Sequence, residues 1–217
     1  GVPSLAAMAA KRHHAPDAVL IYESGAVDAD PPVPPLSMGS PAVTARTVMT
    51  TSCEGVFGLL QRGRIAKGLL SAAQVDRHGN LNSTTLHRPN RPPLRLVGSG
   101  GAHDIAVLVP ELTILMPHDP RRFAARVDHV TSPGRRRPGQ MRGGGPVAVL
   151  TPRARFTFAR GELTLAAVPA GETAARALEG IGWPVPVAEP LVTLPPLPAE
   201  LLATARGLLA TWGRDPA

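Results

Sequence analysis

Residues 18–25 read AVLIYESG, an apolar run that ends in a glutamate and, two residues later, a glycine. A short apolar run with β-branched members predicts a buried strand of the kind found in parallel sheets. Glu23 would then follow the carboxyl end of that strand, where open α/β sheets meet their ligands. A carboxylate next to a glycine that permits unusual backbone angles is well placed as a nucleophile or a base. The alternative interpretation is a glutamate in a surface turn.

Strands and helices are expected to alternate along the rest of the chain. We expect helices over residues 4–14, 50–62, 105–108, 173–178 and 201–209, and strands over residues 18–22, 67–73, 95–97, 112–116, 147–151, 153–158 and 163–168. This alternation predicts an α/β fold with an open, mainly parallel sheet and flanking helices. We expect a single domain over residues 1–217. Its proline-rich segment and closing helix, residues 183–217, would form an appendix.

A glycine-rich segment, Gly98-Ser99-Gly100-Gly101-Ala102, lies between a predicted strand and a predicted helix. Glycines at such a place let backbone N–H groups approach an anion or a developing oxyanion. The spacing is not the GxGxxG of a dinucleotide site, and no Gly-Lys-Ser/Thr of a phosphate-binding loop follows. The alternative is a plain tight turn. His103 comes directly after the segment and is the one histidine for which we consider a functional role.

The charge of the chain does not identify a nucleic-acid-binding protein. Net charge is +7, but only two of the 23 basic residues are lysines and the arginines are scattered, except at residues 135–137. Aromatic residues, which stack on bases in many such proteins, make up 3% of the chain. We expect no nucleic-acid partner, and we interpret residues 135–145 as a solvated loop.

The numbers and spacing of cysteines and histidines argue against a disulfide-rich protein and against a metal site. The single cysteine, Cys53, rules out an internal disulfide framework and a four-cysteine zinc site, and is expected to pack as a helix thiol. The seven histidines show no metal-ligand spacing, so no metal site is predicted. No apolar run is long enough to cross a bilayer and no signal peptide is visible, so we expect a cytoplasmic protein without a membrane partner.

Several motifs occur together in a fixed order. They occupy residues 22–25, 36–39, 73–84, 98–106, 121–123 and 128–134. In this order and spacing they resemble the β subunit of class I (family I) CoA-transferases, in particular that of the glutaconate CoA-transferase type. The resemblance covers residues 1 to about 158. It implies the NagB/RpiA-like α/β fold of that family, with the first strand–helix unit missing, because residues 1–3 resemble the turn that follows the family's first strand.

The resemblance also implies a set of functional residues. Glu23 matches the family's nucleophilic glutamate, which carries CoA as a glutamyl-CoA thioester. The backbone of Gly98, Gly100, Gly101 and Ala102, most directly the amides of the last two, matches the donors to the thioester oxygen. Candidates for the acyl pocket are His103, which stands where the glutaconate type has an asparagine, and Gln74.

The function implied is the catalytic β subunit of a heteromeric CoA-transferase. It would work beside an α subunit, move CoA from an acyl-CoA to a carboxylic acid, and need no cofactor beyond CoA as substrate. Two alternatives stay open: a component of a hydrolase that cleaves a thioester or C–C bond of CoA esters on the same fold, and a non-catalytic component of a biosynthetic complex. Transfer requires an acceptor acid, hydrolysis does not, and the third alternative gives neither.

Overall fold

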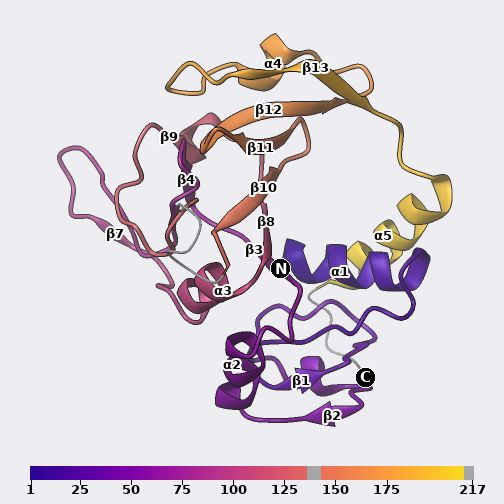
Figure 1. The fold of residues 1–217 in the computed structure, drawn as a ribbon. Helices are drawn as coiled ribbons and strands as arrows, with labels where there is room; N and C mark the ends of the chain where they lie inside the picture. The colour runs from indigo at the N-terminus through magenta and orange to yellow at the C-terminus, as the bar shows by residue number, and fades with distance from the viewer. Residues whose placement is uncertain (136–142, 213–217) are drawn as a thin grey trace. The chain divides into compact units, whose positions relative to one another are not determined.

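A computed structural model describes residues 1–135 and 143–212 (Figure 1). The chain forms two compact units. The first comprises Gly1–Arg64 and the chain from Leu197 onward, and the second comprises Ile65–Pro196. Most of the loop expected over residues 135–145 lies outside the described residues.

Two helices pack together in the first unit, α1 (Val2–His13) and α5 (Ala199–Thr211). Met8, Ala9 and Leu208 are buried between them. A proline in the first turn of α1 and basic residues in its last turn suit the two ends of the helix dipole. The helices predicted over residues 4–14 and 201–209 are both confirmed.

The buried parallel strand expected over residues 18–22 is wrong. The Tyr22–Gly25 turn folds the chain back, so that Ile21 bridges Val27 in antiparallel fashion. Leu20 packs against the α1–α5 cluster, whereas Val19 is 58% exposed. A short apolar run does not distinguish a buried strand from one arm of a turn that packs on helices.

The remaining elements of the first unit follow the turn. Strand β1 (Ala26–Val27) pairs with β2 (Met49–Thr50) in antiparallel register, and the short 3-10 helix η1 (Pro41–Thr44) lies between them in sequence. Helix α2 (Cys53–Gln61) begins where the Ser52 side chain accepts a hydrogen bond from the N–H of Gly55 at 3.2 Å. The helix predicted over residues 50–62 is confirmed, with its start fixed by this cap.

The second unit contains a six-stranded sheet in the order β13-β12-β11-β10-β8-β3. Its strands are β3 (Lys67–Leu70), β8 (Glu111–Leu115), β10 (Pro146–Leu150), β11 (Arg155–Ala159), β12 (Glu162–Pro169) and β13 (Val187–Leu194). The pairs β3–β8, β8–β10 and β12–β13 are parallel, and the two pairs that involve β11 are antiparallel. The predicted α/β class with a mainly parallel sheet is therefore confirmed.

The centre of this sheet is aliphatic, with one aromatic side chain at Phe156. Leu112, Ile114, Val149 and Phe156 are fully buried. Helix α3 (Ala102–Leu108) packs on β3, where a Cβ on Gly68 would come within 3.0 Å of the Ile105 side chain. The short helix α4 (Ala174–Leu178) lies against β12 (Figure 1).

Residues 183–217, expected as an appendix, contribute to both units. Strand β13 extends the main sheet beside β12, and α5 packs on α1. The sequence did not predict β13, because Pro190 within it argues against a strand interior. It lies at an edge of the sheet, where prolines are tolerated.

Two smaller sheets complete the second unit. One has the order β5-β4-β9, formed by β5 (Leu81–Asn82), β4 (Gln74–Asp76) and β9 (Phe123–Ala124). The other is the hairpin of β6 (Thr85–Leu86) and β7 (Leu94–Arg95). The strand expected over residues 95–97 is present in part, as β7, but it ends at Arg95 and belongs to this hairpin, and Val97 is 97% exposed. Neither Glu23 nor the glycine-rich segment follows a strand of the six-stranded sheet.

Candidate active site

Glu23 lies on the tight turn that leads into β1. The N–H of Gly25 donates to the carbonyl oxygen of Tyr22 at 2.9 Å, and the N–H of Tyr22 donates to that of Ala26 at 2.9 Å. Tyr22 and Gly25 are buried, and Glu23 between them is half-buried. Glu23 thus occupies a turn, as the alternative interpretation predicts, but a turn that is anchored in the core of its unit.

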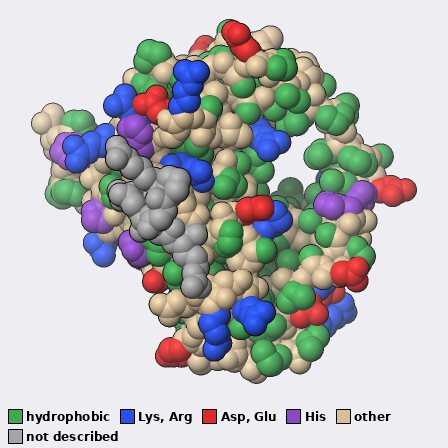
Figure 2. All heavy atoms as spheres, in the orientation of Figure 1, with side chains coloured by type: hydrophobic (Ala, Val, Ile, Leu, Met, Phe, Trp, Pro, Cys, Tyr) green, Lys and Arg blue, Asp and Glu red, His purple; other side chains and the backbone are tan. Residues whose placement is uncertain are grey.

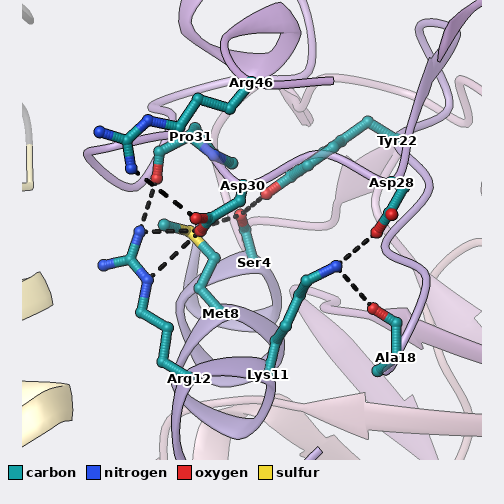
Figure 3. Close-up of polar contacts among 10 residues, drawn as sticks. All are labelled: Ser4, Met8, Lys11, Arg12, Ala18, Tyr22, Asp28, Asp30, Pro31 and Arg46. Atoms are coloured by element: carbon teal, nitrogen blue, oxygen red, sulfur yellow. Dashed lines mark hydrogen bonds and ion pairs between the residues drawn. The ribbon is translucent and has the colours of Figure 1, made fainter. Parts of the chain in front are cut away.

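Helix α1 anchors this turn through Tyr22. The hydroxyls of Tyr22 and Ser4 lie 2.7 Å apart in a buried position (Figure 3). Burial raises the pKa of the Tyr22 hydroxyl, which keeps it protonated as a partner for Ser4. The residue directly before Glu23 is therefore fixed to the first turn of a helix.

The last turn of α1 holds the two stretches of chain that flank Glu23. Lys11 Nζ donates to the carbonyl oxygen of Ala18 at 2.9 Å and also pairs with Asp28 (Figure 3). Arg12 pairs with Asp30 at 3.0 Å. These contacts reach the chain on both sides of the turn, so α1 sets the position of the whole segment.

Gly25 brings the turn close to the start of α2. Its φ is +112°, and a Cβ built on it would lie 1.9 Å from the carbonyl oxygen of Thr51. The N–H of Thr51 donates to the carbonyl oxygen of Gly25 at 2.8 Å. Only glycine allows this approach, so the sequence Glu-x-Gly has a direct structural cause.

Cys53 opens α2 and is exposed, so the expectation of a packed helix thiol is wrong. Partial desolvation and the negative charges of Glu23 and Glu54 raise the pKa of its thiol. A raised pKa lowers the thiolate fraction, so Cys53 is a weak nucleophile.

The glycine-rich segment lies in the second unit, between β7 and α3. Gly98 and Gly100 have φ values of +93° and +47°, which favour glycine, and Gly101 is the N-cap of α3. The N–H of Ala102 donates to the carbonyl oxygen of Ser99 at 2.9 Å. The amide expected as one oxyanion donor is thus engaged within the turn. The N–H of Gly100 makes no hydrogen bond to any residue that the structure describes.

Two polar residues that the sequence did not single out hold this segment. The hydroxyl of Ser83 donates to the carbonyl oxygen of Gly98 at 2.7 Å, and the N–H of Gly98 donates to that of Ser83 at 2.8 Å. The N–H of Ser83 in turn donates to Thr131 Oγ1 at 2.9 Å. Both residues lie within motifs quoted above, which is the signal that marks them, but no spacing rule brings residues 83, 98 and 131 together.

His103 lies beside this group on α3. Its side chain is exposed, and Nδ1 is 3.4 Å from the carbonyl oxygen of Thr131. The contact places the imidazole next to the glycine-rich segment of the same unit. An exposed imidazole at this place is open to contact by a ligand.

Gln74 is buried, and its amide is largely used within the protein. Oε1 accepts hydrogen bonds from Asn82 Nδ2 at 2.8 Å and from the N–H of Asp128 at 3.1 Å, and Nε2 donates to Asp128 Oδ2 at 3.1 Å. Three of its four hydrogen-bonding positions are thus occupied. Gln74 also lines a pocket of about 410 Å³, together with Ala73, Leu86, His87, Arg88, Leu94, Leu96, Asp119, Arg121, Arg122 and Asp128.

The part of the chain that the structure describes holds no cluster of metal ligands. Within residues 1–135 and 143–212 no group of three or more His, Cys, Asp or Glu side chains is arranged to hold a metal ion. In the same described ranges no helix is both long and apolar enough to span a bilayer. On the face shown in Figure 2, basic side chains are interspersed with acidic and apolar ones.

Comparison with known proteins identifies the chain's relatives. Residues 1–152 match the family model of coenzyme A transferase. The chain is 40% identical over 214 residues to the B subunit of 3-oxoadipate CoA-transferase of Pseudomonas knackmussii, covering 94% of this chain and 82% of the relative. It is 32% identical over 215 residues to the B subunit of glutaconate CoA-transferase of Acidaminococcus fermentans, covering 93% and 80%.

Solved structures agree with the sequence matches. The crystal structure of glutaconate coenzyme A-transferase from Acidaminococcus fermentans superposes with a TM-score of 0.83 at 30% identity, covering 95% of this chain and 84% of that one. The decarboxylase AibA/AibB shares the fold, with a TM-score of 0.81 at 24% identity and coverage of 94% and 82%. Since the family model matches well over half of the chain and two curated relatives exceed 30% identity along almost all of it, the chain belongs to the coenzyme A transferase family.

Proposed function

We propose that this chain is the catalytic β subunit of a heteromeric CoA-transferase, in which Glu23 carries CoA between an acyl-CoA and a carboxylic acid. The observation that carries the proposal is the turn of Glu23. Among the residues of the expected site, Glu23 is the carboxylate held by a buried turn, two residues before a glycine, Gly25, that cannot be replaced without a clash. Within this family, that combination fits a nucleophile better than a surface glutamate.

The chemistry needs only carboxylates and a thiol. A Glu23 carboxylate oxygen attacks the carbonyl carbon of the acyl-CoA, the C–S bond breaks, and the CoA thiolate leaves with the electron pair. The resulting mixed anhydride is attacked by the thiolate at the glutamyl carbonyl carbon. The acyl group then departs as its carboxylate, and Glu23 remains as a glutamyl-CoA thioester.

The second half of the reaction reverses these steps with a different acid. The incoming carboxylate attacks the glutamyl-CoA carbonyl and expels CoA thiolate, which then attacks the acyl carbonyl of the new anhydride. Glu23 is regenerated and the new acyl-CoA leaves. No net proton transfer or redox change occurs, so the chain supplies a nucleophile and donors to each oxyanion.

We assign the backbone N–H groups of residues 98–102 as donors to the carbonyl oxygen of the substrate. Each carbonyl attack develops a negative oxygen, and loss of one donor to such an oxygen costs about 10²–10³ in rate in known enzymes. The N–H of Gly100 makes no hydrogen bond to a described residue, so it can donate to this oxygen. For Ala102 to contribute, the bond of its N–H to Ser99 must open when substrate binds. We assign His103 and Gln74 to the acyl side of the site.

The partner we propose is an α subunit that completes the site. The two curated relatives are each named as the B subunit of a CoA-transferase, which implies a second, different chain. Those relatives are named for 3-oxoadipate and glutaconate, which are both dicarboxylic acids. We therefore take short dicarboxylic acids and their CoA esters as the first substrates to assay.

The test uses the complex of this chain with its α subunit, incubated with acyl-CoA alone. CoA should accumulate on this chain as a thioester at Glu23, and borohydride should reduce it to an alcohol that peptide mass spectrometry locates. Glu23→Gln keeps the size of the side chain but removes the attacking charge, so transfer should fall by orders of magnitude. Glu54→Gln, which removes an exposed carboxylate on neighbouring α2, is the matched control and should stay active.

Two results would redirect the assignment. CoA release from acyl-CoA without an acceptor, together with an unlabelled Glu23, favours the hydrolase alternative. Neither transfer nor hydrolysis with any acyl-CoA tested favours the non-catalytic alternative.

A further inference from the structure

We propose that Ser83 is a positioning residue for the transfer reaction, because it clamps Gly98 and thereby fixes the backbone N–H groups that follow. The proposal rests on the function above, in which residues 98–102 bind the carbonyl oxygen. Ser83 does not contact substrate in this scheme. It acts through the glycine-rich segment.

The clamp consists of two reciprocal hydrogen bonds. Ser83 Oγ donates to the carbonyl oxygen of Gly98 at 2.7 Å, and the N–H of Gly98 donates to the carbonyl oxygen of Ser83 at 2.8 Å. Both polar groups of the Gly98 backbone are thereby bonded to one residue. The direction of the peptide planes on either side of Gly98 is set by these bonds.

Packing does not substitute for the clamp. A Cβ built on Gly98 would meet nothing within 4 Å, and the neighbouring Val97 is 97% exposed. Gly98 has φ +93°, in a region that glycine enters and leaves readily. On this side of the segment the backbone therefore depends on hydrogen bonds to Ser83 for its conformation.

Ser83 is itself held by a buried polar network. Its N–H donates to Thr131 Oγ1, which also lies 2.7 Å from the Thr84 hydroxyl. Asn82, directly before it, has no exposed surface; its side-chain amide donates to Gln74 Oε1 at 2.8 Å and its oxygen accepts from the N–H of Thr84 at 2.9 Å. These hydrogen bonds connect Ser83, and with it the clamp, to strands β4 and β5.

Loss of the clamp should misalign the donors without preventing folding. Positioned donors lose their effect steeply with displacement, and a shift of about 1 Å in a reacting group costs up to about 10²-fold in rate. We therefore expect Ser83→Ala to lower kcat by about 10- to 100-fold with little change in KM for acyl-CoA. The hydroxyl that is removed is half-buried, and its partner, the Gly98 carbonyl, can bind water instead.

The experiment compares three variants of the heteromeric complex. Ser83→Ala removes the hydroxyl, Ser83→Thr restores one and should recover most of kcat, and Thr85→Ala is the matched control. Thr85 makes a similar side-chain bond to the carbonyl oxygen of Leu94 at 3.3 Å in the adjacent hairpin, so its loss should leave kcat near the wild-type value. A purely structural role for Ser83 would instead appear as a lower melting temperature with unchanged kcat.

A second measurement reads the donors directly, without turnover. In complexes that also carry Glu23→Gln, the infrared stretch of a carbon-13-labelled thioester carbonyl should be shifted down on binding, and Ser83→Ala should reduce that shift. Equal kcat for wild type and Ser83→Ala, no rescue by Ser83→Thr, or an unchanged carbonyl shift would overturn the proposal. Absence of CoA transfer by the wild-type complex would instead overturn the proposed function. In that case the effect of Ser83→Ala on the carbonyl stretch would still test whether the clamp positions the donors.

Discussion

Replacing Gly25 by alanine should damage both the stability of the first unit and the activity of the complex. Gly25 has φ +112°, and its Cβ would lie 1.9 Å from the carbonyl oxygen of Thr51. No real Cβ tolerates such a contact with backbone. The chain must either change φ or move β1 away from the residues that precede α2, and either movement displaces Glu23.

The magnitude follows from two effects. A left-handed backbone costs a non-glycine residue about 1–2 kcal/mol. Separation of the two segments also breaks the bond from the N–H of Thr51 to the carbonyl oxygen of Gly25, now 2.8 Å long, at about 0.5–1.5 kcal/mol. Together these give about 1.5–3.5 kcal/mol, which is a large share of the roughly 5–15 kcal/mol that typically stabilises a domain.

The assay is urea unfolding of the complex, followed by the fluorescence of its tryptophans, alongside transfer activity. Gly161→Ala is the matched control, because Gly161 has a similar φ of +82° but open space where its Cβ would lie. It should show the backbone cost alone, about 1–2 kcal/mol, with normal activity in the folded fraction. If Gly25→Ala proves no more damaging than Gly161→Ala, the close approach of the turn to Thr51 is not what constrains residue 25.

Two further predictions concern stability. Tyr22→Phe should cost about 1–2 kcal/mol, because the buried Ser4 hydroxyl keeps the weak bond to the Met8 sulfur at 3.9 Å but loses the one to Tyr22, and adding Ser4→Ala should recover part of that loss in the same unfolding assay. Glu172→Gln should lower the melting temperature at pH 7, and this effect should shrink as the pH falls below 4.5 and be small near pH 2. Hydrogen bonds from Arg153 and from the N–H of Thr173 lower the Glu172 pKa from 4.5 to about 2, so its contribution to stability is fully present above pH 4.5 and is lost as the pH falls through about 2. A difference that persists unchanged at pH 2 would contradict this account.

The sequence predicted those elements whose patterns are local. Helices α1, α2 and α5 and the central strands β8, β10 and β12 lie close to their expected places, because apolar periodicity and caps act within a few residues. The strand predicted over residues 18–22 is wrong, because some of its apolar residues pack against helices α1 and α5 and others form a small turn. Strand β13 was not predicted, because the edge position that allows Pro190 is a property of the whole sheet.

The candidate site shows the same division. Glu23 and the glycines were singled out as candidates from the residues themselves, since a carboxylate close to a glycine and a run of glycines are visible in the sequence. Ser83 and Thr131 were not found, because their roles depend on hydrogen bonds that span 15 and 48 residues. The engagement of Ala102 N–H by Ser99 was also invisible, since it depends on how a tight turn closes.

The two parts of the proposed site are held by different forces, and this has a consequence for mutagenesis. The turn of Glu23 is fixed by buried packing, by Tyr22 and by the close contact of Gly25 with Thr51. The segment at Gly98 lies in open surroundings and is fixed by hydrogen bonds. Changes near Glu23 should therefore alter stability and activity together, whereas changes at Ser83 should alter activity with little loss of stability. Parallel behaviour of Gly25→Ala and Ser83→Ala in both measurements would show that one of the two segments is held in another way.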